Sequence, residues 1–353
     1  MTDALPGEGG AIGHNERAAS AGQAASPLTR ARRPGAPAGR RPLSPHSQPD
    51  PHRFEDVPRS GPSVVALGGG HGLATALAAV RRYAGSITAV VSVADNGGSS
   101  GQLRETLGIP APGDLRRCLV ALAGEGASAG WVSAFGHRFD EGELAGHALG
   151  TLVIAGMADF LGDFERAIEE AGRLLDVVGQ VYPASAEPVG LRACVAGVMV
   201  EGQVAVAAST GPIERVELVP GNPAACAGAI QAIELAEQVV LAPGSLFTSL
   251  LPALLVPEIR AAVEATAGSV VQVCNLHPQK PETDGLDGTD HLRALRGHGV
   301  RVDTLLYQEA GALAVDEAAV AGLGARAVAG DVGGRAARSH DPARLATALR
   351  ALL

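Results

Sequence analysis

The sequence predicts an α/β fold of the Rossmann-like type, with a mainly parallel sheet flanked by helices and a small insertion rich in β-hairpins. Two apolar runs carry this prediction, because each is followed by a glycine-rich loop. Residues 64–67 lead into the loop 68–72, and residues 87–93 lead into the loop 95–101. Apolar residues recur at helical spacing between the two runs. A strand, a helix and a second strand in this order predict a right-handed crossover and parallel pairing.

The later elements follow from the same patterns. Asp114 stands at the start of one helical stretch and Asp163 just before another, where an aspartate can cap free N–H groups. Short apolar runs bounded by turn residues mark the strands. We expect, in chain order, helices at 113–122, 146–161 and 164–175, strands and hairpins at 177–219, a helix at 223–237, a strand at 238–241, further helices, a strand at 270–274, a helix at 290–296, a strand at 301–307, and a final strand and helix at 325–329 and 342–352.

The chain is expected to divide into a tail and one domain. Residues 1–60 are rich in proline, arginine and alanine and lack apolar periodicity, which predicts a disordered tail. An arginine-rich transit peptide is the alternative, but early acidic residues and the prolines oppose an amphipathic helix. Residues 61–353 are expected to form a single α/β domain.

Composition and charge exclude several classes of protein. With 46% hydrophobic and 18% charged residues among 353, the chain can bury a large core. The net charge is -9, of which the tail carries +2 and the rest -11, so broad nucleic-acid binding, which needs a basic face, is not expected. No apolar run reaches the length of a membrane span, and the four cysteines form no Cys-x-x-Cys pair. We therefore expect a cytoplasmic protein with reduced thiols.

The first loop, residues 68–72 (GGGHG), has the composition of a phosphate-binding turn. Glycines let the backbone approach a phosphate, and the following helix supplies free N–H groups and a partial positive charge. Leu73 stands where a dinucleotide fingerprint needs its third glycine, which disfavours a nicotinamide dehydrogenase. A P-loop is excluded because no Gly-Lys-Ser/Thr follows. The alternative is a tight turn without a ligand.

The second loop, residues 95–101 (DNGGSSG), leaves the next strand and is expected to face the same crevice. Asp95 can bind a ribose hydroxyl or a cation. Ser99 and Ser100, with their N–H groups, form a candidate anion nest. A flexible loop with an Asx-turn is the alternative.

Three later segments add polar groups to the candidate site. Asp114 and Arg116 (in PGDLRR) lie close in sequence to both loops, with a helix cap as the alternative for Asp114, and Arg117 is expected to be solvated. Residues 242–249 (APGSLFTS) repeat the order of strand end, glycine, hydroxyls and helix, and an N-cap is the alternative for Thr248. Asn275 ends a strand before a long polar loop and suits recognition of a sugar or base.

These segments are expected to converge, because the carboxyl ends of parallel strands meet at one edge of a sheet. Scattered histidines without ligand spacing predict no metal site, and His147 is equally well a core histidine or a site residue. No nucleophile motif is present. The candidate binding residues are Gly68, Gly69, Gly70, His71, Gly72, Asp95, Asn96, Gly97, Gly98, Ser99, Ser100, Asp114, Arg116, Gly244, Ser245, Leu246, Thr248 and Asn275.

Together these segments resemble the gluconeogenesis factors, the YvcK-like branch of the CofD (2-phospho-L-lactate transferase) superfamily. The matching stretches lie in family order over residues 63–308 and include VVALGGGHGL, ITAVVSVADNGGSSGQLRETLG, PGDLRRCLVALAG, GHALGTLVIAG, VYPASAEPV, LAPGSLFTSLLPALLVPEI and CNLHPQKPETDGLDGTDHLRAL. The resemblance implies a cytoplasmic protein that binds UDP-N-acetylglucosamine, needs no cofactor, and supports gluconeogenic growth, cell-wall precursor balance and cell shape.

The transferase branch of the superfamily moves a phospholactyl group onto a deazaflavin with magnesium, and this chain departs from what that chemistry needs. Asn96 stands where relatives have a second aspartate, and one carboxylate makes a poorer magnesium site than two. Leu286 stands where relatives often have an aromatic residue. A deazaflavin pocket is expected to be lined by aromatic side chains, and aromatics make up only 3% of this chain.

We therefore expect a regulatory protein that binds a nucleotide sugar without turnover. A CofD-type phospholactyl or nucleotidyl transferase is the alternative. No nucleic-acid partner and no membrane span are expected, and a homo-oligomer is left open by the sequence.

Overall fold

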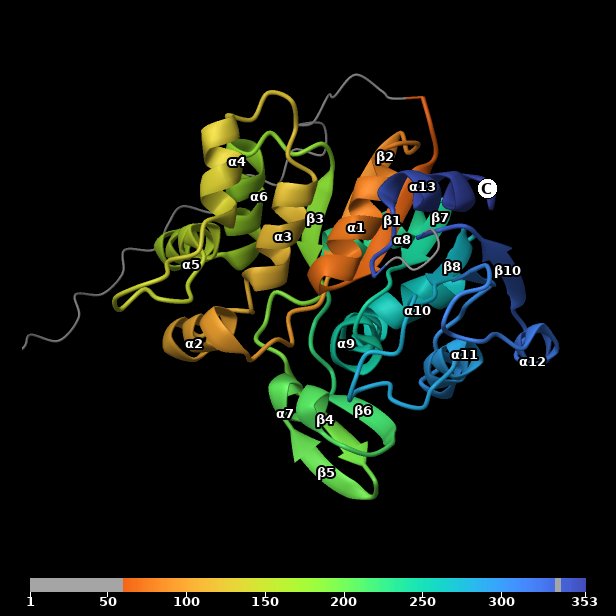
Figure 1. The fold of residues 1–353 in the computed structure, drawn as a ribbon. Helices are drawn as coiled ribbons and strands as arrows, with labels where there is room; N and C mark the ends of the chain where they lie inside the picture. The colour runs from red at the N-terminus through yellow and green to blue at the C-terminus, as the bar shows by residue number, and fades with distance from the viewer. Residues whose placement is uncertain (1–59, 334–337) are drawn as a thin grey trace, which may run out of the picture. The chain divides into compact units, whose positions relative to one another are not determined.

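A seven-stranded parallel sheet forms the centre of the fold in the computed structural model, in which residues 60–333 and 338–353 are described (Figure 1). The strand order is β10-β9-β8-β7-β1-β2-β3, and every neighbouring pair is parallel. The strands are β1 (Ser63–Gly68), β2 (Ser86–Val91), β3 (Gln180–Pro183), β7 (Gln238–Leu241), β8 (Ser269–Val273), β9 (Thr304–Gln308) and β10 (Arg326–Gly330). The predicted Rossmann-like α/β class is confirmed.

The direction in which strands are added to the sheet reverses between β1 and β7. From β1 the chain adds β2 and β3 on one side, and it then crosses to β7 and adds β8, β9 and β10 on the other. Connections leaving neighbouring strands in opposite directions open a crevice at their carboxyl ends, and open α/β sheets bind ligands there. The loop after β1 and the loop after β7 flank this switch point.

Helices cover the sheet, and α1 (Gly70–Val80) packs against β1, α3 and α13 (Figure 1). Its buried face consists of leucine, valine and alanine, as expected of a helix against a parallel sheet. The others are α2 (Gly98–Leu107), α3 (Gly113–Ala121), α4 (Ala129–Gly136), α5 (Leu149–Leu161), α6 (Phe164–Leu174), α8 (Ala227–Glu234), the π-helical turn η1 (Leu246–Leu250), α9 (Leu251–Leu254), α10 (Pro257–Ala265), α11 (Gly288–Gly297), α12 (Glu317–Gly322) and α13 (Pro342–Arg350).

The predicted β-hairpin insertion is a three-stranded antiparallel sheet of order β5-β4-β6, which forms the lowest part of the view in Figure 1. It consists of β4 (Gly190–Val195), β5 (Val198–Glu201) and β6 (Ile213–Val219), with a short helix, α7 (Gln203–Ala208), between β5 and β6. The sequence pattern predicted only strands here, so α7 is a correction.

Several helix and strand boundaries differ from the prediction. The helix expected at 223–237 begins only at Ala227, because Ala225 pairs with Ser185 in an isolated bridge and donates its N–H to Glu258. Helix α4 was not predicted. Asp163 caps α6 as expected, since its side chain accepts from the Arg166 N–H.

The tail predicted for residues 1–60 lies outside the described residues except at its last position, and that prediction stays untested. Within the described ranges, no single helix is long and apolar enough to span a membrane. One pair of helices, Leu246–Leu254 with Pro257–Ala265, together has the length and composition of a membrane span, but the pair is bent by 78°.

Candidate functional site

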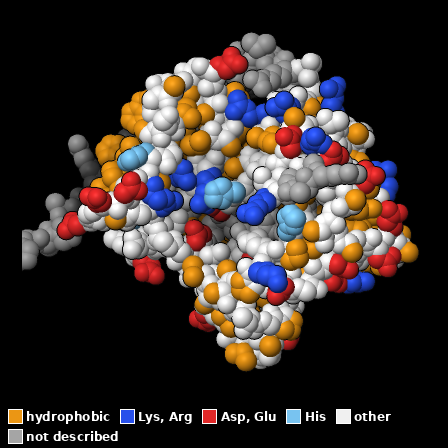
Figure 2. Space-filling model, in the orientation of Figure 1, with side chains coloured by type: hydrophobic (Ala, Val, Ile, Leu, Met, Phe, Trp, Pro, Cys, Tyr) orange, Lys and Arg blue, Asp and Glu red, His pale blue; other side chains and the backbone are white. Residues whose placement is uncertain are grey.

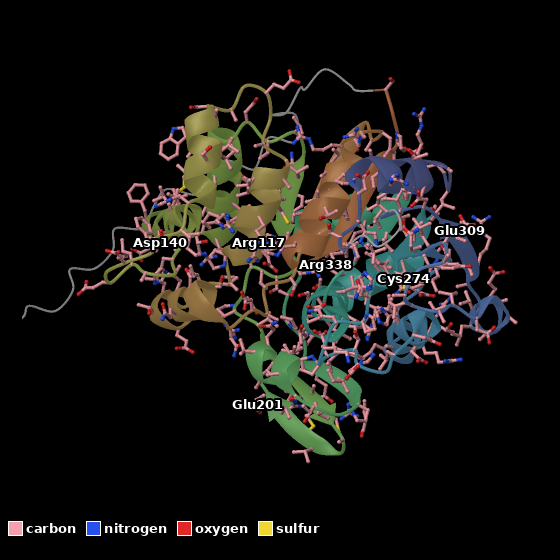
Figure 3. All side chains as sticks on the ribbon, viewed as in Figure 1. Arg117, Asp140, Glu201, Cys274, Glu309 and Arg338 are labelled. Carbon is pink, nitrogen blue, oxygen red and sulfur yellow. The ribbon has the colours of Figure 1, made fainter. Side chains whose placement is uncertain are left out.

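A small pocket lies at the switch point, where the loops after β1, β2 and β7 meet α3 and α7. Its volume is about 150 Å³. Figure 2 shows arginine and histidine side chains gathered across the middle of this face, and Figure 3 shows Arg117 beside the starting end of α1. The pocket is lined by Gly70, Ser92, Asp95, Asp114, Arg117, Gln203, Thr248 and Ser249.

The loop after β1 reaches this pocket at Gly70. Gly70 has a φ of +62°, and a Cβ added to it would meet no heavy atom within 4 Å, so Gly70 faces open space. Its N–H donates to Asp114 Oδ2 over 2.6 Å. In the described part of the chain the N–H groups of His71 and Gly72 have no hydrogen-bond acceptor. The start of α1 therefore offers two unsatisfied donors and the positive end of the helix dipole.

Gly72 has a different role from Gly70. A Cβ on Gly72 would lie 1.7 Å from the Pro243 carbonyl oxygen, closer than any non-bonded contact. The glycine at position 72 thus allows the turn after β1 and the turn after β7 to touch. This contact fixes the width of the crevice.

In the loop after β2, Asp95 is held with its carboxylate at the pocket. Its Oδ1 accepts from the Gly97 N–H over 2.8 Å. Burial raises the pKa of Asp95, opposed by that bond and by a hydrogen bond from Ser100. Asn96, next in sequence, turns away and accepts from the Val204 N–H over 3.0 Å. Asp95 therefore lines the pocket, whereas Asn96 holds the start of α7.

Ser99 lies in the first turn of α2, where its hydroxyl is 2.8 Å from His147 Nδ1. The residues are 48 positions apart in sequence, so no local pattern indicated the pair. His147, left open between core and site, contacts a predicted site residue. A histidine at this distance can take a proton from the hydroxyl or donate one to it, depending on its tautomer.

The two arginines of α3 exchange the roles that the sequence suggested. Arg116 is 8% exposed and donates to the Phe135 carbonyl oxygen, and burial lowers its pKa to about 10. Arg117, expected to be solvated, lines the pocket and pairs with Asp114. Successive residues on a helix point about 100° apart, so only one of the two can face the crevice. Arg116 does not line the pocket, and its role in binding stays a prediction.

The turn after β7 is held by side chains from the loop after β8. The Asn275 amide bonds both backbone groups of Gly244: Oδ1 accepts from the N–H over 2.6 Å, and Nδ2 donates to the C=O over 2.8 Å. Gln279 donates to Ser245 Oγ. Asn275 and Ser245 thereby build the turn, and neither lines the 150 Å³ pocket.

Glu282 occupies the N–H groups at the start of η1. Its carboxylate is 3% exposed and accepts from the N–H of Phe247 over 2.7 Å and from the N–H and hydroxyl of Thr248 over 3.1 and 3.0 Å. Burial raises the pKa of Glu282, and these hydrogen bonds oppose the rise. The donors that a phosphate would need at this helix start are already bound by an internal anion.

The tertiary structure thus brings together part of the predicted set. One pocket is lined by Gly70, Asp95, Asp114 and Thr248, whereas Leu246 is buried. The N-cap of η1 is Ser245 and not Thr248. Glu282 was not predicted. The sequence signal for it is the glycine-and-hydroxyl pattern at 242–249, because the N–H groups of such a turn need an anionic acceptor. The other pocket residues that the sequence did not single out are Ser92, Arg117, Gln203 and Ser249.

Magnesium, which the resemblance associates with the transferase branch, does not fit these residues well. No group of three or more potential metal ligands occurs among residues 60–333 and 338–353. Of the two carboxylates lining the pocket, Asp114 is bonded to the Gly70 N–H and to Arg117, and Asp95 to the Gly97 N–H. Hard cations need several oxygen ligands, so no chemical step is assigned to a metal here.

The fold and the pocket define a Rossmann-like α/β protein whose polar residues converge at the strand ends. A model of the CofD family, described as 2-phospho-L-lactate transferase CofD, matches residues 64–336. The chain belongs to this family, within its gluconeogenesis-factor branch.

Relatives and a crystal structure support this assignment. A protein of Nostoc named "Putative gluconeogenesis factor" is 43% identical over 237 residues, covering 67% of this chain and 52% of that protein. A "Gluconeogenesis factor" of Halalkalibacterium halodurans is 42% identical over 252 residues, covering 70% and 78%. The crystal structure of a UPF0052 family member from Bacillus halodurans has a TM-score of 0.78 and 36% identity, covering 82% of this chain and 99% of that one. The chain thus spans about half the length of its Nostoc relative.

Proposed function

We propose that this chain binds a nucleotide sugar, UDP-N-acetylglucosamine, in the crevice at the switch point and acts as a regulator rather than as an enzyme. The observation that carries the proposal is that Gly70, Asp95 and Thr248, from three different loops, line one pocket between β1 and β7. Ligands of open α/β sheets bind at such positions.

We assign the diphosphate to the start of α1. Among the described residues the N–H groups of His71 and Gly72 have no acceptor, and Arg117 lines the pocket together with Gly70, the residue that precedes them. The N–H groups at the start of η1 and the Thr248 hydroxyl are bound to Glu282, so the turn after β7 contributes the hydroxyl group of Ser249 instead. A helix start with free donors and a nearby arginine is a favourable anion site.

Asp95 is assigned to a hydroxyl or amide group of the ligand, because a carboxylate accepts hydrogen bonds and repels phosphate. The pocket of about 150 Å³ holds only part of the ligand, since complete small-molecule sites are about 300–1,000 Å³. The rest of the molecule extends from the pocket over the surrounding loops.

Calorimetric titration of the full chain with UDP-N-acetylglucosamine tests the site. We expect Asp95→Ala to weaken binding by about tenfold or more, because a hydrogen bond to a charged group contributes about 1.5–3 kcal/mol. Arg117→Gln should weaken it to a similar degree, whereas Arg82→Gln, an exposed arginine at the far end of α1, should leave it unchanged. Equal binding by the wild type and Asp95→Ala would show that the ligand does not bind in this crevice.

The dissociation constant should not change when a chelator is added, because the pocket offers too few carboxylates for a cation. A loss of binding in the chelator that magnesium restores would overturn this part of the proposal.

In the cell, the proposal places the protein in the cytoplasm, supporting growth on gluconeogenic carbon sources, cell-wall precursor balance and cell shape. The names of its relatives support the first of these roles. A strain lacking the gene should recover gluconeogenic growth with the wild type but not with Asp95→Ala. Recovery with both would separate the cellular role from ligand binding.

A CofD-type transferase is the second candidate, and the Ser99–His147 contact of 2.8 Å favours it. A hydroxyl beside a histidine can take part in proton or group transfer. Incubation with nucleotide sugars and phospholactyl donors, followed by chromatography, distinguishes the two. Turnover that disappears in His147→Gln while UDP-N-acetylglucosamine binding remains would establish the transferase; the absence of turnover supports the regulator.

A further inference from the structure

A second and larger groove lies between the small sheet and the C-terminal helices, away from the crevice. Its volume is about 590 Å³. Residues 215–219 of β6 line one side, and Leu255, Arg260 and His298, at or near the ends of α9, α10 and α11, line the other. Five consecutive residues of one strand line it, so the groove runs along the strand edge.

The backbone of β6 is open on the side of this groove. In the order β5-β4-β6 the strand pairs only with β4. The C=O of Leu191 accepts from the Gly202 N–H, on the side of β4 that faces β5, so the Leu191–Leu218 pair exchanges no hydrogen bonds. The N–H and C=O of Leu218 therefore point outward, and no described residue bonds them.

His298 shows that the outward groups of β6 face the groove. Its Nε2 accepts from the Val216 N–H over 3.1 Å, and its Nδ1 lies 2.7 Å from the Ala294 carbonyl oxygen. Alternate residues of a strand point their backbone groups the same way. Val216 and Leu218 thus share one edge, of which His298 covers one donor. An edge without a strand partner is a template for another strand, and here it is reached from the groove, because Val216 and Leu218 are 2% and 4% exposed and both line it.

The groove is basic on an acidic protein. Arg192, Arg215 and Arg260 line it together with one acidic residue, Glu217, an excess of two positive charges. Arg192 and Arg215 both pair with Glu217, at 2.8 and 2.9 Å. Residues 61–353 as a whole carry -11, so this groove has the opposite sign to their net charge. Leu255 and Val219, the latter 44% exposed, add apolar contact area.

We propose that this groove binds an extended acidic segment of a partner protein, which adds a strand to the free edge of β6. Main-chain hydrogen bonds to Leu218 and to the Val216 C=O would hold the segment, and carboxylates on it would meet Arg215 and Arg260. Strand addition of this kind combines backbone affinity with side-chain specificity. Two other occupants of the groove are disfavoured by charge. The chain's own residues 1–60 carry +2, and a second copy of β6 would bring the same arginines together.

Fluorescence anisotropy with a labelled, end-blocked octapeptide of alternating glutamate and valine tests the proposal on the full chain. We expect saturable binding that is lost when lysine replaces glutamate in the peptide. N-methylation of one alternate set of peptide nitrogens should abolish binding, while methylation of the other set should be tolerated, because only one set pairs with β6.

Arg260→Glu should weaken binding by about tenfold or more, since it reverses a charge in the groove. Arg350→Glu, an exposed arginine on α13, is the matched control and should stay within twofold. If Arg260→Glu lowers the melting temperature, Arg260→Gln replaces it, with a smaller expected loss. No binding at submillimolar peptide, or binding that neither N-methylation nor Arg260 substitution reduces, would overturn the proposal.

Discussion

The turn after β1 and the turn after β7 begin alike and differ in what occupies their helix N-termini. Each has a glycine with positive φ, Gly70 at +62° and Gly244 at +126°. At the first turn, two N–H groups in the first turn of α1 remain unsatisfied within the described chain. At the second, Glu282 fills the donors of Phe247 and Thr248. An internal carboxylate is present at both turns, but Asp114 takes only the Gly70 N–H, whereas Glu282 takes both N–H groups at the start of η1.

Gly72→Ala should have the largest effect, because it disrupts the contact between the two turns. The new Cβ would lie 1.7 Å from the Pro243 carbonyl oxygen, and backbone on both sides leaves little room to adjust. We expect a loss of about 3 kcal/mol or more in the free energy of unfolding. Chemical denaturation measures it, and a loss below about 1 kcal/mol would mean that the turns separate easily.

Glu282→Ala should come next, because it empties the start of η1. Three donors would lose a buried acceptor, and each buried unsatisfied group costs about 1–3 kcal/mol. We expect about 3 kcal/mol less stability, while Glu282→Gln, which keeps an acceptor oxygen, should lose about half of that. If both variants match the wild type in denaturation, the carboxylate does not hold this turn.

Gly70→Ala should affect binding more than folding. Its Cβ points into open space, so the stability cost is only that of a left-handed residue, about 1–2 kcal/mol. The methyl group would lie where the ligand approaches the backbone, and we expect UDP-N-acetylglucosamine to bind about tenfold more weakly, or 1.4 kcal/mol. Unchanged affinity in calorimetry would mean that the turn after β1 contacts no ligand.

The smallest expected effect is a pH dependence from Glu282. Burial raises its pKa in the folded protein above the ordinary value of 4.5. Between pH 4.5 and the folded pKa, folding therefore takes up a proton. The contribution of this shift to stability is fully present below pH 4.5 and is lost as pH rises through the folded pKa. Relative to Glu282→Gln, the wild type should gain stability as the pH falls through the folded pKa of Glu282 toward 4.5. The opposite slope in thermal unfolding would show that its hydrogen bonds outweigh burial.

The fold was predictable because its signals are local. Apolar runs of four to seven residues, glycine loops after them and aspartate caps such as Asp163 all act within a few positions of the chain. The helix start that the sequence placed too early, near position 223, failed because Ser185, which is distant in sequence and lies outside the named strands, pairs with Ala225. Pattern alone contains no information about such a pairing.

The candidate site was predictable only as a set of loops. The sequence by itself determined that glycines, Asp95 and hydroxyl residues follow parallel strands, and hence that they meet at one edge of the sheet. Tertiary structure alone decided which groups line the pocket, Arg117 rather than Arg116 and Asp95 rather than Asn96, and that Glu282 occupies the N–H groups of η1. The physical reason is that strand and helix patterns are set by neighbours in sequence, whereas a hydrogen-bond donor is free or occupied according to groups such as Glu282, 34 residues from Thr248 along the chain.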